Sequence, residues 1–458
     1  MVQRGYNRRE MSESGPTRAL IDSVAGIHLA EVPETALTVA RHCVLDWFGC
    51  ALAGSREPLS EILVGEIAAR EPGESTLVGR AERSTLLTAA LVNGAMSHAL
   101  DFDDTHWTMN GHPSVPVVPA LLALAEHEGS DGRAFLTAVV SGIEFECRLG
   151  ALIGGPHYAA GFHATGTLGT FGAAAAASHL LGLDMDAWCN AIGLAGTQAA
   201  GLKSGFGTMA KPLHAGRAAS NGLLAALLAR GGFTGNPAII ETAQGFAATH
   251  AGGAIDRDRL ARVGDRFLIT ETLFKYHASC YLTHAPIEAA SSLRADGLQV
   301  DDIESVEVRG STTCVGVCDI EEPMTGLQGK FSLRATTAMA LLGDDTSDPA
   351  TFSDERMGDR ELLAMRDRVV FTPEPGPATR ATVVVRANGR ELSAEADTGQ
   401  PANDLDGQWA KLSAKFFALA KPIVGSESAD ALHSAVSGVE DLHSVRDLIA
   451  LTRPAVRA

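Results

Sequence analysis

The chain has 458 residues, of which 45% are hydrophobic and 20% charged, and its formal net charge is −18. This length and low charge density predict two or three folded domains with a buried core, and they argue against a disordered chain. The acidic balance disfavours nucleic acid and anionic membrane as partners, because both are polyanions that proteins hold with lysine and arginine.

The sequence favours a location in the cytoplasm. Residues 1–18 are polar and predict a frayed tail rather than a signal peptide. The uncharged stretch from Leu149 to Leu183 is long enough to cross a bilayer, but its content of Ala, Gly, Thr and His favours buried helix and loop. Seven cysteines, an odd number, suit a reducing compartment. We therefore predict a soluble cytoplasmic protein without a membrane partner.

The first part of the chain, from about Ile21 to Leu268, has apolar residues at the spacing of helices. One predicted helix follows Ser84, which suits an N-cap, and another runs from Pro212 to Arg230 and ends at two glycines. We find no convincing alternating strand in this region.

The pattern changes after about residue 275. Residues 303–309 alternate in the manner of a strand. Residues 381–387 and 390–396 also alternate, and Asn388-Gly389 between them predicts a hairpin with a type I′ turn.

Helical spacing returns over residues 411–420, 429–436 and 445–451. We predict a mainly α fold, with a large helical domain formed by both chain ends and a smaller α+β domain inserted between them. The predicted bounds are 1–271 and 404–458 for the helical domain and 272–403 for the inserted α+β domain.

Common nucleotide and cluster motifs do not occur in the sequence. There is no phosphate-binding loop and no nucleophile elbow, and Cys314 with Cys318 offers too few thiolates for an iron–sulfur cluster. The segment from His98 to His106 is the best metal candidate, because it has carboxylates and imidazoles close together. Helix capping and ion pairing explain the same residues without a metal.

The same segment also suggests the edge of a cleft. Leu91, Gly94, His98, Asp101 and Thr105 follow helical spacing on a face that is apolar at its start and polar at its end. A stripe of core residues has no reason to end in this way, whereas the tip of a helix that lines a cleft does.

Further clusters could carry chemistry. His112 is either an active-site histidine or a hydrogen-bonded loop histidine. Residues 156–167 place histidines and hydroxyls at a helix start, where amide donors attract carboxylates, although structural histidines at an N-cap explain them too. Lys211 stands beside Pro212 at another helix start, which favours an anionic ligand over a solvated surface lysine. Cys280 is predicted to be a buried thiol rather than a nucleophile.

Together these motifs resemble the MmgE/PrpD family, which includes 2-methylcitrate dehydratase, cis-aconitate decarboxylase and iminodisuccinate epimerase. The resemblance covers nearly the whole chain in order, and it implies a helical domain from both chain ends, an α+β lid, a homodimer, and activity without metal or organic cofactor. The motifs are Asn93-Gly, His98-Ala-Leu-Asp-Phe-Asp-Asp-Thr, His112-Pro-Ser, His163 with Gly166-Thr-Leu-Gly, Lys211-Pro-Leu-His-Ala-Gly, and Lys275 with Ser279-Cys and Thr283-His.

The chain departs from the family at one position. Many dehydratases and decarboxylases of the family carry Pro-Tyr after the Lys330-Phe-Ser-Leu motif, with the tyrosine in the active site, whereas this chain has Arg334-Ala335. The stretch around Tyr158 is similar to the epimerase branch, so Tyr158 is predicted to supply the missing hydroxyl.

The resemblance implies proton transfer at the carbon next to a carboxylate of a small di- or tricarboxylic acid. His112 and His163, with ordinary pKa values near ~6.5, would form the acid/base pair, and Asp101 would orient one of them. The predicted catalytic residues are His112, His163, Asp101, Tyr158 and Lys211, and the predicted substrate-binding residues are Lys275, Thr105, Lys211 and His284.

We therefore predict a hydro-lyase similar to 2-methylcitrate dehydratase. An epimerase of the iminodisuccinate type and a decarboxylase of the cis-aconitate type use the same kind of pocket and stay open. A dimer that binds a metabolite without catalysis is the alternative from a different class.

Overall fold

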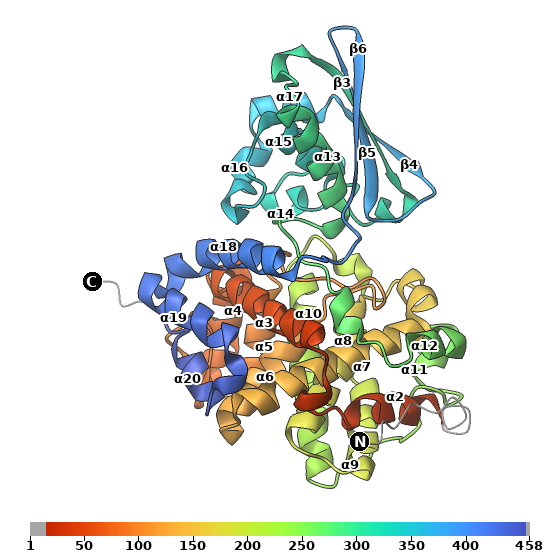
Figure 1. Ribbon diagram of the computed structural model, residues 1–458, viewed down its shortest axis with the longest axis vertical. Coiled ribbons are helices and arrows are strands. Elements are labelled where there is room, and N and C mark those ends of the chain that lie inside the picture. Colours follow the sequence, from red (N-terminus) through yellow and green to blue (C-terminus); the bar gives the residue numbers. More distant parts are fainter. Residues whose placement is uncertain (1–14, 455–458) are drawn as a thin grey trace.

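The computed structural model describes residues 15–454, and its fold is mainly α, as predicted. Figure 1 shows two bodies, a helical body (residues 16–271 and 405–450) and above it an α+β body (residues 284–397). Most of the tail predicted over residues 1–18 lies outside the described residues. The prediction is wrong for Pro16–Arg18, which begin helix α2 (Pro16–Ala25).

The helical body is built on alanine and glycine, which let helices approach closely. An added Cβ on Gly94 would lie 2.8 Å from Cα of Gly216, so two of the helices touch at their backbones. Within the described residues, the N-terminal part of this body has the helices α2, α3 (Glu34–Gly54), α4 (Pro58–Glu66), α5 (Leu86–Ser97), α6 (Ser114–Glu128), α7 (Gly132–Ala159), α8 (Ala164–Leu180), α9 (Met185–Gly196), α10 (Ala210–Arg230), α11 (Phe246–His250) and α12 (Arg257–Val263).

Helix α3 is a core helix of this body. It is long and apolar enough to cross a membrane, but 83% of its apolar window is buried inside the protein. Three helices near the C-terminus return to pack on the same body, in agreement with the helical spacing of their sequence. They are α18 (Leu405–Val424), α19 (Ser426–Ser437) and α20 (Val445–Ala450). Figure 1 places α18 at the surface that faces the α+β body.

Two short strands correct the prediction of an uninterrupted helical region. Strand β1 (Ser75–Thr76) pairs antiparallel with β2 (Arg83–Ser84). Ser84 is therefore a strand residue, and Thr85 takes the position before α5. Strands of two residues are too short for an alternating pattern, so the sequence does not reveal them.

The α+β body has a four-stranded sheet with the order β4-β3-β5-β6. The predicted hairpin is confirmed, because β5 and β6 pair antiparallel and Asn388 and Gly389 both have positive φ, as a type I′ turn requires. The strands are β3 (Ile303–Ser311), β4 (Val369–Glu374), β5 (Arg380–Ala387) and β6 (Arg390–Asp397), and the helices are α13 (His284–Ala295), α14 (Gly326–Gly329), α15 (Leu333–Leu342), α16 (Asp354–Met357) and α17 (Arg360–Arg366).

The two bodies are joined by two segments that lie side by side, residues 272–283 and 398–404. The Tyr281 hydroxyl in the first segment donates a hydrogen bond to the Thr398 carbonyl in the second. The bodies also share a core, because Leu100 and Phe102 of the helical body belong to the hydrophobic cluster of the α+β body. Residues 100–102 therefore lie where the two bodies meet.

Candidate active site

A cavity of about 100 Å³ gathers most of the predicted site residues. Its charged residues and histidines come from the helical body and the first connecting segment, and the α+β body adds Thr313, Val317 and Phe331. Apolar side chains, including Trp107 and Phe206, cover much of the wall. The predicted site residues that line the cavity are Asp101, Thr105, His112, Tyr158, His163, Lys211 and Lys275.

His284 is the predicted site residue that the structure does not bring here. It is buried at the start of α13 and lines a separate cavity of about 530 Å³ beside the connecting segments. Tyr281 lines both cavities, and the centroid of its ring lies 4.8 Å from that of His284. The tyrosine ring thus forms a wall between His284 and the other site residues.

Asp101 lies on an irregular turn rather than on a helix. Helix α5 ends at Ser97, so the predicted helical face through His98, Asp101 and Thr105 is wrong. Asp101 has a φ of 52°, a left-handed backbone that most residues with a side chain avoid and that Asp tolerates better. The Thr105 backbone pairs with Leu273 of the first connecting segment, which fixes the far end of the turn.

Two lysines meet on the Asp101 carboxylate. The Lys211 ammonium, in the first turn of α10, pairs with Oδ1, and Nζ of Lys275 lies 3.0 Å from the same oxygen. These two ammonium groups keep the pKa of Asp101 far below its usual range, although burial opposes them. Asp101 therefore holds the two lysines together. Its Oδ1 also lies 3.8 Å from Nε2 of His112, and a role for Asp101 in orienting that histidine stays a prediction.

His112 has a fixed tautomer. Its Nδ1 lies 2.7 Å from the carbonyl oxygen of Asp104, which can only accept a hydrogen bond, so Nδ1 carries the proton. Burial lowers the pKa of His112 below 6.5, with the Asp103 carboxylate opposing the shift. The predicted ordinary pKa is therefore wrong. In the neutral ring Nε2 keeps a free lone pair, 3.8 Å from Oδ1 of Asp101, and can act as a base.

Asp103, which is not among the predicted site residues, contacts both His98 and His112. Its Oδ1 lies 2.8 Å from Nδ1 of His98, and its Oδ2 lies 2.9 Å from Nδ1 of His112. It is fully buried, and the two imidazoles keep its pKa well below the usual range against the effect of burial. The spacing of His98 and Asp103 was visible in the sequence, but only as a metal candidate.

Four of these residues have donor atoms close enough for a metal ion. One ligand atom each from His98, Asp101, Asp103 and His112 lies within 4.8 Å of the others. However, the ammonium groups of Lys211 and Lys275 already occupy Oδ1 of Asp101 and would repel a cation. The donor set therefore fits an internally balanced charge network better than a metal centre.

His163 stands just before α8 and is also a neutral imidazole. Its Nδ1 lies 3.1 Å from Nδ1 of His214, while its buried Nε2 has no hydrogen-bond partner within residues 15–454. Burial lowers the pKa of His163 well below 6.5, and the positive charge of Lys211 adds to the effect. The predicted ordinary pKa is wrong here too.

Tyr158 lies in the last turn of α7 and lines the cavity. Nζ of Lys203 lies 3.9 Å from the centroid of the ring, in the geometry of a cation–π contact. Burial raises the pKa of Tyr158, so the hydroxyl keeps its proton at neutral pH. Ala335, the position of the expected departure from the family motif, is buried in α15 and does not line the cavity.

Cys280 lines the cavity as a buried free thiol. A hydrogen bond with Cys318 lowers the pKa of Cys280. In the same cavity, the neutral ring of His112 offers an unprotonated nitrogen at neutral pH.

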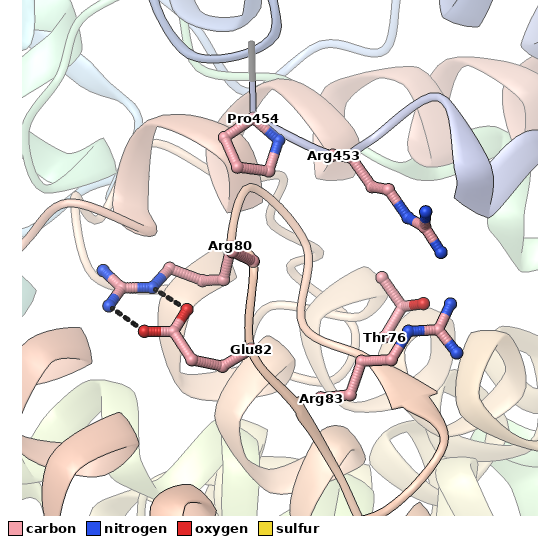
Figure 2. Close-up of a pocket in the computed structure, with 7 residues that line it drawn as sticks. Thr76, Arg80, Glu82, Arg83, Arg453 and Pro454 are labelled. Atoms are coloured by element: carbon pink, nitrogen blue, oxygen red, sulfur yellow. Dashed lines mark hydrogen bonds and ion pairs between the residues drawn. The ribbon is translucent and has the colours of Figure 1, made fainter. Parts of the chain in front are cut away.

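A third cavity, of about 330 Å³, lies at the surface of the helical body (Figure 2). Its arginines suggest an anion site, but Arg80 already pairs with Glu61 and Glu82 and donates to the Ser55 carbonyl. None of the predicted site residues lines it. It is therefore separate from the candidate active site.

Comparisons with known proteins agree with the resemblance read from the motifs. The model of the MmgE/PrpD N-terminal domain matches residues 18–257, and that of the MmgE/PrpD C-terminal domain matches residues 277–441.

Three relatives show the range of the similarity. The Cis-aconitate decarboxylase-like protein oryM of Aspergillus oryzae is 28% identical over 473 residues, which cover 96% of this chain and 97% of that protein. The cis-aconitate decarboxylase of Homo sapiens is 26% identical over 95% of this chain and 94% of its own. The 2-methylcitrate dehydratase of Salmonella typhimurium is 27% identical over 78% of both chains.

Proposed function

The chain belongs to the MmgE/PrpD family, and from that premise we propose that it is a hydro-lyase of the 2-methylcitrate dehydratase type. The enzyme would act without a cofactor on a small di- or tricarboxylate, by moving a proton at the carbon next to a carboxylate. Relatives named as decarboxylases and dehydratases support an enzyme of this class.

His112 is the proposed base, and its geometry is the observation that carries the proposal. The Asp104 carbonyl keeps the proton on Nδ1, and the lowered pKa keeps Nε2 unprotonated at neutral pH. A base of this kind can remove a carbon-bound proton once the substrate lies beside it.

Lys211 and Lys275 would hold the substrate carboxylate. Both ammonium groups contact Oδ1 of Asp101 and line the cavity, so their remaining N–H donors can hold a substrate carboxylate. Their positive charge also stabilises the carbanion-like species that forms next to the carboxylate. The Thr105 hydroxyl, which donates to the Gly111 carbonyl over 3.2 Å, can also accept from the substrate.

Tyr158 is the proposed acid, with His163 as the second candidate. The Tyr158 hydroxyl stays protonated and lines the cavity, so it can protonate a leaving hydroxyl. Tyr158 also favours epimerisation as an alternative, because the epimerase branch has a tyrosine at the matching position. The names of the relatives favour decarboxylation as another.

The remaining proposals concern the assembly and its location. We propose a homodimer in which residues 272–403 act as a lid on the helical domain. The seven free cysteines support a cytoplasmic protein, since a reducing compartment keeps thiols free.

Incubation with 2-methylcitrate, cis-aconitate or iminodisuccinate in D₂O, followed by NMR, tests the proposal. Dehydration of 2-methylcitrate is the expected result. Loss of CO₂ from cis-aconitate, or deuterium exchange alone with iminodisuccinate, would instead identify a decarboxylase or an epimerase. Thermal stabilisation by these acids without any turnover would contradict catalysis and favour a metabolite-binding protein.

A further inference from the structure

Three buried ammonium groups hold three consecutive carbonyls beneath the cavity. Nζ of Lys330 lies 2.9 Å from the Leu100 oxygen, that of Lys275 lies 2.6 Å from the Asp101 oxygen, and that of Lys415 lies 2.6 Å from the Phe102 oxygen. The chain has only seven lysines, so this concentration is not a matter of composition.

The three lysines come from different parts of the molecule. Lys330 belongs to the α+β body, Lys275 to the first connecting segment, and Lys415 to α18. The turn at Asp101 is therefore held from three sides. Because Lys330 is the only one of the three in the α+β body, its hydrogen bond ties that body directly to the turn.

Lys330 differs from the other two in making no ion pair within residues 15–454, although the carboxylates of Glu57 and Asp101 act on it from farther away. Lys275 pairs with Asp101, and Lys415 pairs with Asp46 at 2.6 Å. Lys330 is 5% exposed, and no carboxylate within residues 15–454 lies within ion-pair distance of its Nζ. Burial lowers the pKa of Lys330 to about 8, against the opposing effect of Glu57 and Asp101, so the charged form is disfavoured at this position.

A buried cation that no carboxylate contacts directly weakens a fold, so a role beyond stability is needed to explain Lys330. Lys330 does not line the cavity, although its neighbour Phe331 does. Its ammonium group donates a hydrogen bond to the carbonyl oxygen of Leu100. The next residue, Asp101, is the one with the left-handed backbone. An ammonium donor on a long stem makes a stronger hydrogen bond to a carbonyl than a neutral donor does.

We infer that Lys330 is a positioning residue, which holds Asp101 and its two lysines in register only while the α+β body is docked on the helical body. This inference rests on the proposed function of the same site. Without the Lys330 hydrogen bond the turn can relax, and the carboxylate that gathers Lys211 and Lys275 moves relative to His112.

The test replaces Lys330 by Met, which keeps the stem and removes the charge, and by Arg, which keeps the charge. We expect Lys330→Met to lower kcat at least about ten-fold, while KM changes less than about two-fold and Tm stays within a few degrees of wild type. Lys330→Arg restores most of kcat. Lys421→Met, an exposed lysine on α18, is the control and leaves kcat unchanged.

Crystal structures of the wild type and of Lys330→Met give a readout that needs no turnover. The inference predicts that φ of Asp101 relaxes, or that the contacts of Lys211 and Lys275 with Asp101 change. An unchanged Asp101 overturns it, even if the wild type converts none of the acids and the proposed function fails. A loss of kcat that follows a matching loss of Tm overturns it as well. Lys330→Gln, a smaller change, carries the same test if the Met variant does not fold.

Discussion

His112 owes its proposed role to a backbone atom rather than to its own intrinsic pKa. The carbonyl of Asp104 decides which ring nitrogen keeps the proton, and burial decides that the ring stays neutral. Asp101 and Asp103, two residues apart, divide the other tasks: one gathers ammonium groups and the other contacts imidazoles.

Replacing His112 by Ala should remove the proposed base. We expect kcat to fall by about 10²–10⁴-fold, because general base catalysis is worth about that much. Steady-state kinetics on whichever acid the wild type converts would measure the loss. His127→Ala, an exposed histidine at the end of α6, is the matched control. Near-normal turnover of His112→Ala would remove His112 from the mechanism.

The Asp103 carboxylate should set the acid limb of the pH profile. Its negative charge raises the pKa of His112, against the lowering by burial. In Asp103→Asn the pKa of His112 therefore falls further, and the acid limb of kcat/KM moves to lower pH. The limb of the wild type should itself lie below ~6.5, the ordinary value for histidine. A limb that moves to higher pH in the variant would contradict this assignment.

The sequence could predict which residue types form the site, but not how they pair. Lysines are rare in this chain, and the predicted site residues other than His284 line one cavity. The roles of Asp101 and Asp103 depend on the turn after α5, which no local pattern encodes. Lys330 and Lys415 reach that turn from 230 and 313 residues away, and such contacts leave no signal in spacing.

At the scale of elements, the structure follows the sequence where local chemistry decides. The hairpin at Asn388-Gly389 was predictable because a type I′ turn needs positive φ at both positions. The end of α5 was not, because distant lysines hold the residues that follow it. The close packing of α5 and α10 depends on Gly94 and Gly216, and it can be tested with single methyl groups.

Gly216→Ala should destabilise the helical body. The added Cβ would lie 2.1 Å from the Leu91 carbonyl oxygen, so α5 and α10 must separate. Overpacking of this kind lowers the free energy of unfolding by about 1–3 kcal/mol. Gly155→Ala is the control within α7, since its Cβ meets nothing within 4 Å. We expect it to add about 0.5–1 kcal/mol, as alanine does in helices. Urea unfolding measures both, and equal effects would contradict the packing argument.

For the molecule as a whole, the candidate site is where two separately built cores meet. Leu100 and Phe102 extend from the helical body into the hydrophobic cluster of the α+β body, so the turn between them depends on both. Directly after this turn, the pKa of Asp103 is lowered and that of Asp104 is raised. The titration of these two carboxyl groups contributes to the pH dependence of the stability of the whole protein.

Asp104→Asn should make the free energy of unfolding depend less on pH. Burial, with help from the Asp46 carboxylate, raises the pKa of Asp104 to about 8, whereas an unfolded aspartate titrates near ~3.9. Because the pKa of Asp104 is higher in the folded protein, its protonated form contributes stability. This contribution is complete when the pH is below the pKa of the unfolded aspartate, and it is lost as the pH rises towards 8. Asparagine does not titrate, so the free energy of unfolding of the variant should rise relative to that of the wild type at the alkaline end of this range.

Chemical unfolding at several pH values measures this difference. Asp103→Asn is the contrasting variant, because its pKa is lowered and its ionised form adds stability above the unfolded value. It should be less stable than the wild type at neutral and alkaline pH. A parallel pH dependence of wild type and Asp104→Asn would show that Asp104 ionises normally.

The two connecting segments run side by side, tied by Tyr281 and Thr398, so the α+β body leaves and rejoins the chain at nearly one point. A module attached in this way can be exchanged between relatives with only two splice junctions. Grafting the corresponding module of a relative onto this helical body would change the part of the cavity wall that the α+β body supplies, while the imidazoles and ammonium groups stay the same. Such chimeras would show which body decides the acid that the enzyme accepts.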